Sequence, residues 1–174
     1  MQVIKYPPRK SWQEILQRPA LDTQSLQATV AKVLEDVKQQ GDDAVKAYTK
    51  QFDKVNLDSL EVKSEEWAQA TAQVPLALQN AIKQAKANIQ LFHESQKQTP
   101  TVVETMPGVR CWRKMVAIEK VGLYIPGGTA PLFSTILMLA IPAIIAGCSE
   151  VVLCSPPAKN GKINPAILYT AKLC

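Results

Sequence analysis

The chain contains one long stretch, from Val121 to Ser149, in which no residue carries a charge. A run of this length could cross a bilayer, because a membrane-spanning helix needs about 20 apolar residues. Prolines and glycines at 126–128 and Pro131 interrupt its first part, and they leave an apolar helix candidate of only about 15 residues. A helix buried between two strands has the same composition. We therefore expect a buried strand–turn–helix here and no membrane partner, with the membrane span kept as the alternative.

The segments on either side of this stretch extend it into a β-α-β order. The expected elements are a buried strand at 120–125, a turn at 126–128, a helix at 134–146 that Pro142 kinks and Gly147 ends, a second buried strand at 150–154, and a helix from Pro165. Strands that alternate with helices at this spacing are typical of a parallel sheet.

The residues before this segment are predicted to be mainly helical. Helices are expected at 11–18, from Asp22 or Thr23 to Gly41, from Asp42 past Phe52, from Ser64, and from Pro75 to about Gln98. Ser11 and Glu14 have the spacing of a capping box, and Pro19 is expected to end the first helix. Pro75 is expected to occupy the first helical position.

Apolar residues recur along these helices with helical spacing. The three predicted apolar faces are Leu26, Val30, Val33, Leu34 and Val37; Val45, Tyr48 and Phe52; and Leu78, Ile82, Ala85, Ile89 and Phe92. Residues 102–103 and 109–116 are β-prone, and Arg113 would spoil a buried face there, so we expect an exposed or edge strand.

These patterns predict an α/β fold, with a helical N-terminal region followed by the start of an incomplete Rossmann-like parallel βαβ sheet. The predicted divisions are an N-terminal helical arm at 1–20, the first part of a helix-rich α/β domain at 21–119, and the start of a second, truncated Rossmann-like domain at 120–174. Two parallel strands cannot cover their own faces, and open sheets usually carry more of them. We therefore expect a longer protein.

Composition argues against several classes of partner. The net charge is +5, but the longest basic patch is thin (Arg110, Arg113, Lys114 and Lys120), so we expect no nucleic acid. The four cysteines form no C-x-x-C pair, and His93 is the single histidine, so the chain offers no zinc site of its own. No apolar segment follows the basic residues near Met1, which favours a cytoplasmic protein with free cysteines.

The turn after the first predicted parallel strand is the candidate ligand site. Gly127 and Gly128 allow close backbone approach, in a position where α/β proteins hold phosphates. The full G-x-G-x-x-G fingerprint is absent, so a tight turn that needs glycine dihedrals is an equal alternative. Tyr124, at the carboxyl end of the strand, either stacks on a base or ribose or covers the edge of the core.

His93 has two possible roles. A general base is one, and a favourable charge near the C-terminus of its helix is the preferred one. The cysteines lack a visible base partner, so a nucleophile is not expected among them.

One sequence run carries a specific resemblance. The run Val-Gly-Leu-Tyr-Ile-Pro-Gly-Gly-Thr-Ala-Pro-Leu-Phe-Ser-Thr, from Val121, closely resembles histidinol dehydrogenases, and so do 136–143 and 151–157. Earlier stretches at 41–44, 88–93 and 107–109 fit the same family. The resemblance covers nearly the whole chain.

The resemblance implies an enzyme that oxidises L-histidinol to L-histidine in two NAD-dependent steps. It implies one zinc per active site, an intertwined homodimer and two incomplete Rossmann-like domains. The tyrosine of the Tyr-Ile-Pro-Gly-Gly run contacts NAD in this family, which assigns that role to Tyr124. The family's zinc ligands (a glutamine, two histidines and an aspartate) and its Glu-His acid–base pair have no counterpart here. We therefore expect no catalytic or metal residue in this chain, and no turnover by it alone. The alternative is a non-catalytic binding or dimer-assembly module with the same fold.

Overall fold

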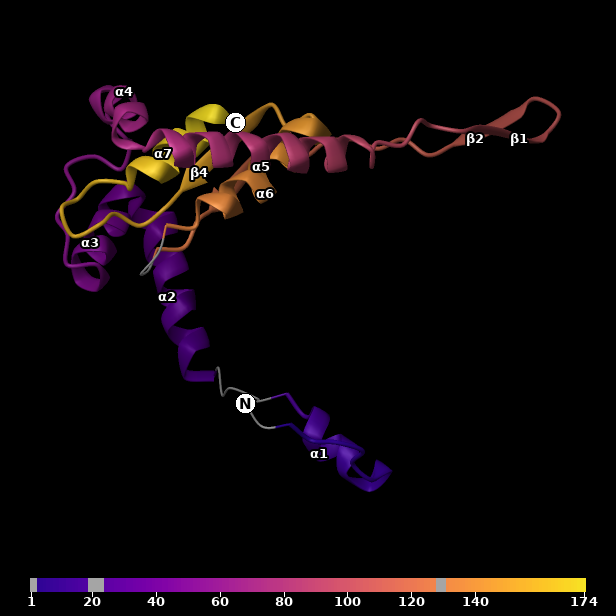
Figure 1. The fold of residues 1–174 in the computed structure, drawn as a ribbon, viewed down its shortest axis with the longest axis horizontal. Helices are drawn as coiled ribbons and strands as arrows, with labels where there is room; N and C mark the ends of the chain where they lie inside the picture. The colour runs from indigo at the N-terminus through magenta and orange to yellow at the C-terminus, as the bar shows by residue number, and fades with distance from the viewer. Residues whose placement is uncertain (1–2, 19–23, 128–130) are drawn as a thin grey trace. The chain divides into compact units, whose positions relative to one another are not determined.

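The computed structural model describes residues 3–18, 24–127 and 131–174, and its elements are shown in Figure 1. The fold is α/β, about 53% helical, with two two-stranded sheets in the described residues. The chain divides into two compact units, Met1–Ala44 and Val45–Cys174. In chain order the elements are η1 Arg9–Ser11, α1 Trp12–Leu16, α2 Gln24–Gln40, α3 Asp42–Phe52, α4 Ser64–Gln73, α5 Leu76–Glu94, β1 Val102–Met106, β2 Val109–Trp112, β3 Lys120–Tyr124, α6 Phe133–Ala146, β4 Glu150–Cys154 and α7 Pro165–Leu173.

The predicted capping box at the start of α1 is wrong. Ser11 has helical backbone angles, with φ −92° and ψ −3°, because it ends the preceding 3-10 turn. An N-cap residue needs an extended backbone to turn its side chain onto the helix. The Ser11 hydroxyl instead donates to the Pro8 carbonyl at 2.8 Å. The predicted stop at Pro19 and the predicted caps at Asp22 or Thr23 lie outside the described residues.

The helices α2 and α3 meet at Gly41, as predicted. Gly41 has a φ of +58°, the left-handed conformation that glycine adopts without steric cost, and it lets one helix end where the next begins. The predicted burial of Phe52 is wrong. Its side chain is 60% exposed at the last position of α3, where it stacks on Tyr48 with ring centroids 5.7 Å apart. The predicted apolar face of α2 is also largely exposed, at Leu26, Val30 and Leu34.

The helices α4 and α5 form as expected, with small shifts at their ends. Pro75 is the N-cap of α5 and not its first residue, and α5 ends at Glu94, earlier than predicted. Ile82 is 1% exposed and anchors the predicted buried face. The predicted burial of Phe92 is wrong, because this residue lies in the last turn of α5 and stays 61% exposed.

The strands β1 and β2 form an antiparallel hairpin. Gly108 occupies the turn with a φ of +84°. Every residue of both strands is exposed, as the charged alternation predicted, and Figure 1 shows the hairpin extending beyond the end of α5. The second strand ends at Trp112, before the predicted limit of 116.

The parallel pair β3 and β4 confirms the βαβ prediction. The register joins Lys120 to Glu150 at one end and Tyr124 to Cys154 at the other, with α6 as the connection. The prediction that both strands are buried is wrong for one face. Side chains alternate along each strand between exposed and partly buried, so one face packs on helices and the other is open.

Helices and sheet share two clusters of buried residues within the second unit. The first lies where α5, α6 and α7 meet, and the second joins the end of β3 to α6 and α7. The members are Val74, Ile82, Leu137, Ile141, Ala166 and Tyr169 in the first cluster and Ile125, Ile136, Ala140 and Ile167 in the second. None of the helices in residues 3–18, 24–127 and 131–174 has the length and hydropathy that a membrane crossing requires.

Candidate functional site

Tyr124 is the last residue of β3, at the carboxyl edge of the parallel pair. Its side chain is 63% exposed and belongs to the open face of the sheet, so it does not cover the core. Open parallel sheets bind ligands at this edge, since the loops that follow the strands lie together there. The phenol ring is therefore placed where a ligand could stack on it.

The residue next to Tyr124 fixes the strand end. Ile125 is fully buried in the second cluster, and its N–H donates to the Cys154 carbonyl at 2.8 Å. This bond extends the pairing of β3 and β4 one step past the strands. Cys154 itself is exposed and pairs with Tyr124 in the register, about 4.8 Å away between the strands.

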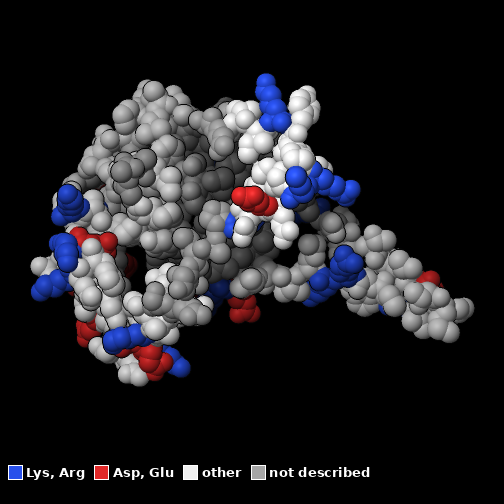
Figure 2. All heavy atoms as spheres, turned by 90° about the horizontal axis from the view of Figure 1, so that it is seen from below, with Lys and Arg blue, Asp and Glu red and all other residues white. Residues whose placement is uncertain are grey.

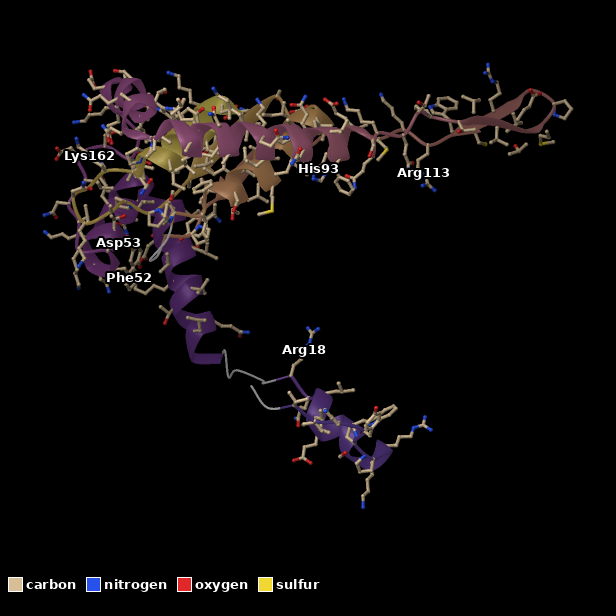
Figure 3. The ribbon with its side chains drawn as sticks, in the orientation of Figure 1. Arg18, Phe52, Asp53, His93, Arg113 and Lys162 are labelled. Carbon is tan, nitrogen blue, oxygen red and sulfur yellow. The ribbon has the colours of Figure 1, made fainter. Side chains whose placement is uncertain are left out.

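A hollow of about 1140 Å³ adjoins this edge of the sheet. Tyr124, Cys154 and Ser155 belong to its lining, together with apolar residues of α6 and α7 and polar residues of the segment before α4. Asp53 and Lys162, labelled in Figure 3, add charged groups to the lining. Ligand sites typically measure about 300–1,000 Å³, so this hollow has room for a molecule as large as a dinucleotide.

The space at Gly127 is limited by Pro156, which lies in the loop after β4. A Cβ at this position would lie 2.5 Å from Cγ of Pro156, a distance that real Cβ atoms do not show. Its φ is outside the left-handed region that the glycines at 41, 108, 147 and 161 occupy. The prediction that this turn needs glycine for its backbone dihedral angles is therefore wrong at Gly127. Glycine is required there because a Cβ atom would clash with the ring of Pro156. Gly128 lies outside the described residues.

The sequence of this chain is similar to known proteins over nearly its whole length. The profile of the histidinol dehydrogenase family matches residues 16–174. The chain belongs to the histidinol dehydrogenase family. It is 57% identical over 173 residues to histidinol dehydrogenase of Bacteroides fragilis (strain ATCC 25285) and 49% identical over 166 residues to that of Escherichia coli O157:H7. These alignments cover 99% and 95% of this chain.

The fold agrees with the family assignment. The crystal structure of histidinol dehydrogenase from Elizabethkingia anophelis superposes with a TM-score of 0.92 at 50% identity, over 96% of this chain and 39% of that one. The chain likewise spans 40% of the Bacteroides fragilis protein and 37% of the Escherichia coli one, and the match is to the N-terminal part of these relatives.

The single histidine of the sequence lies on α5 and not on the strands β3 and β4. His93 is in the last turn of α5, labelled in Figure 3, and its Nδ1 lies 2.7 Å from Oε1 of Gln96. Its ring also meets Phe92 edge-on, with centroids 5.4 Å apart. His93 thus lies in the last turn of α5, where a favourable charge was predicted, and its charge stays a prediction.

Charged side chains lie in several separate groups, and some of them form ion pairs. Figure 2 shows Lys and Arg in separate groups, with Asp and Glu among them, on the described part of one face. Within the thin basic patch, Lys120 forms an ion pair with Glu150 at 2.8 Å, while Arg110 lies in β2 and Arg113 follows it. In the described residues, no group of three His, Cys, Asp or Glu side chains is placed to hold a metal ion.

The four cysteines are free, as predicted, and one has a distinct environment. Burial raises the pKa of the Cys174 thiol, and the Lys86 ammonium partly lowers it again. Lys86 also donates from Nζ to the Leu173 carbonyl at 2.5 Å, so it caps the C-terminal end of α7.

The sequence predicted Tyr124 as a site residue but did not mark the residues that surround it. Nothing in the sequence marked Pro156, because its contact with Gly127 depends on the parallel pairing of β3 and β4. The register that puts Cys154 beside Tyr124 follows from the parallel pairing once both strands are aligned. Aligning the C-terminal ends of the two predicted strands would have placed Cys154 beside Tyr124.

Proposed function

We propose that this chain is the N-terminal, cofactor-binding part of an enzyme that oxidises L-histidinol to L-histidine in two successive NAD-dependent steps. The observation that carries the proposal is the exposed ring of Tyr124 at the carboxyl edge of β3, beside a hollow large enough for a dinucleotide. Membership of the histidinol dehydrogenase family supports the reaction. Because the chain matches only part of its relatives, the whole reaction belongs to the longer protein.

NAD fits the residues at this edge. When bound, one NAD+ would accept a hydride from the substrate alcohol, and a second NAD+ would accept one from the hydrated aldehyde. Tyr124 offers a flat apolar surface for a base or ribose and a hydroxyl that can hydrogen-bond. The side chain is 63% exposed, so a ligand can reach it. Ile125, the next residue, is fully buried and anchors the end of the strand in the second cluster.

Zinc does not fit the described residues, which bring no set of metal ligands together. The zinc ligands and the acid–base pair that the family resemblance implies are therefore assigned to the part of the relatives that this chain does not match. We expect this chain, purified alone, to form no NADH from histidinol, with or without added zinc. Histidinol-dependent NADH formation by the isolated chain would contradict this assignment of the zinc ligands and the acid–base pair.

The remaining parts of the proposal rest on the family resemblance for the homodimer, and on the sequence pattern for the location and the division into domains. They are a cytoplasmic homodimer and a division into an arm at 1–20, a helix-rich part at 21–119 and the start of the NAD-binding domain at 120–174. Analytical ultracentrifugation of the isolated chain, and of a chimera in which it replaces the matching part of the Bacteroides fragilis relative, would test the homodimer.

Protection of Cys154 tests the position of NAD directly. The thiol is exposed and is paired in the register with Tyr124, so bound NAD should slow its alkylation by iodoacetamide. Cys111, equally exposed in the β1–β2 hairpin, is the matched control and should react at an unchanged rate. Mass spectrometry of the peptides gives both rates in one sample. Equal rates for Cys154 with and without saturating NAD would contradict the proposed site.

A further inference from the structure

We infer that the contact between Gly127 and Pro156 is a positioning device for the cofactor edge, an inference that rests on the proposed function. Its role is to hold the chain after β3 against the loop after β4, so that Tyr124 keeps one fixed arrangement. Gly127 follows Tyr124 by three residues, and Pro156 follows Cys154 by two. The contact therefore joins the two loops that leave the carboxyl edge.

The closeness of the contact limits what can occupy position 127. A Cβ there would meet Cγ of Pro156 at 2.5 Å and its Cβ and Cδ at 3.6 and 3.7 Å. Carbon atoms pack best at about 3.5–4.0 Å, so an alanine would force the two segments apart by about 1 Å. The obstacle is a proline ring, which cannot swing aside as the end of a long side chain would.

The loop that carries Pro156 is well braced, so the displacement would fall on the Gly127 side. The Ala158 N–H donates to the Lys162 carbonyl at 2.9 Å, and the Gly161 N–H donates to the Ala158 carbonyl at 2.8 Å. Asn164 then caps α7 by accepting from the Ala166 N–H at 2.9 Å. A Cβ at Gly161, which has a φ of +77°, would lie 3.6 Å from Cγ1 of Val55, so this loop also packs near another segment.

On the other side, one bond holds the strand end. The Ile125 N–H donates to the Cys154 carbonyl at 2.8 Å, and Gly127 is the next point of contact between the two segments. Separating Gly127 from Pro156 would pull directly on that bond and on the strand end that carries Tyr124. Gly127 and Pro156 are thus positioning residues and make no contact with the reacting atoms.

The test is a rescue experiment with three variants of this chain: Gly127→Ala, Pro156→Ala, and both together. Replacing Pro156 by alanine removes the Cγ at 2.5 Å and leaves the Cβ at 3.6 Å, an ordinary contact. The double variant therefore has room for the new Cβ. We expect Gly127→Ala to raise the Kd for NAD about tenfold or more, and the double variant to return to within about threefold of the parent.

A second readout is independent of NAD. Hydrogen exchange of the Ile125 amide, followed by NMR, reports whether the bond to Cys154 stays closed. We expect exchange to accelerate about tenfold or more in Gly127→Ala and to recover in the double variant. A loss of overall folding would instead accelerate exchange throughout α6 and would not be rescued selectively.

The outcomes separate the two proposals. A parent chain that binds NAD, with Tyr124→Ala weaker but Gly127→Ala equal to the parent, overturns the positioning role alone. A Gly127→Ala variant that is weak and is not rescued by Pro156→Ala also overturns it. A parent that does not bind NAD overturns the proposed site, and the exchange of Ile125 then decides the inference: exchange that stays equal to the parent in Gly127→Ala overturns the role of the contact in holding the sheet edge.

Discussion

Replacing Ile125 by alanine tests whether the buried cluster beneath Tyr124 stabilises the fold. Ile125 is 0% exposed and packs with Ile136, Ala140 and Ile167. The substitution removes three carbon atoms, worth about 0.8 kcal/mol each in transfer from water, or about 2.4 kcal/mol together. The cavity left behind adds to this, so we expect the free energy of unfolding to fall by about 3–4 kcal/mol.

The assay is urea unfolding of this chain at 25 °C, followed by far-UV circular dichroism. A lower midpoint with an unchanged slope identifies a change in stability and not in the compactness of the unfolded chain. Ile118→Ala is the matched control, because it removes the same atoms from a side chain that is 71% exposed. The control should change stability by no more than about 0.5 kcal/mol. Equal losses in the two variants would refute the assignment of Ile125 to the core.

Four further predictions concern α7 and its neighbours. Because burial raises the pKa of Cys174, its alkylation should be slower than that of Cys111 at pH 8, and the unfolded chain should lose the difference. The unfolded thiol ionises first as pH rises, so this cysteine should lower the free energy of unfolding above about pH 8.5, and a Cys174→Ser variant should lack that decline. Lys86→Met should cost about 1–2 kcal/mol in urea unfolding, because it removes the charged donor at the end of α7, whereas the exposed Lys83→Met should cost little; similar losses would contradict the cap. Tyr169→Phe should be neutral or stabilise by up to about 1 kcal/mol, because the buried hydroxyl lacks a partner in the described residues, and a loss above that would point to a bond there.

Elements whose signals are local could be predicted from the sequence. The β-α-β segment was correct in type and order because its strands are apolar, its helix ends at a left-handed glycine with φ +94°, and α7 begins at a proline. Gly41 separated α2 from α3 for the same reason. Each of these features depends on the backbone preferences of one or two residues, which a single sequence displays.

Features that depend on packing could not be predicted in the same way. Periodicity assigned Phe52 and Phe92 to buried faces, but both lie in last helical turns and stay 60% and 61% exposed. Apolar composition alone suggested that β3 and β4 were buried on both faces, whereas helices cover one face of the pair.

At the candidate site too, local features followed from the sequence and features that depend on packing did not. The position of Tyr124 at a strand end followed from the sequence, and its exposure agrees with the ligand alternative over the core alternative. The reason for glycine at 127 did not follow, because it depends on Pro156, a residue 29 positions further along the chain. Contacts between two loops require the parallel register, which only the folded pair fixes.

Calorimetric titration of NAD into this chain and its Tyr124→Ala variant tests the cofactor site most directly. Stacking of a base on an aromatic ring is worth about 1–3 kcal/mol, so the variant should bind NAD about tenfold or more weakly. Tyr6→Ala is the matched control, since Tyr6 is 98% exposed and lies far away in the sequence. We predict parental affinity for Tyr6→Ala and weakened affinity for Tyr124→Ala. Equal affinity in all three proteins would contradict the placement of NAD at the carboxyl edge of β3.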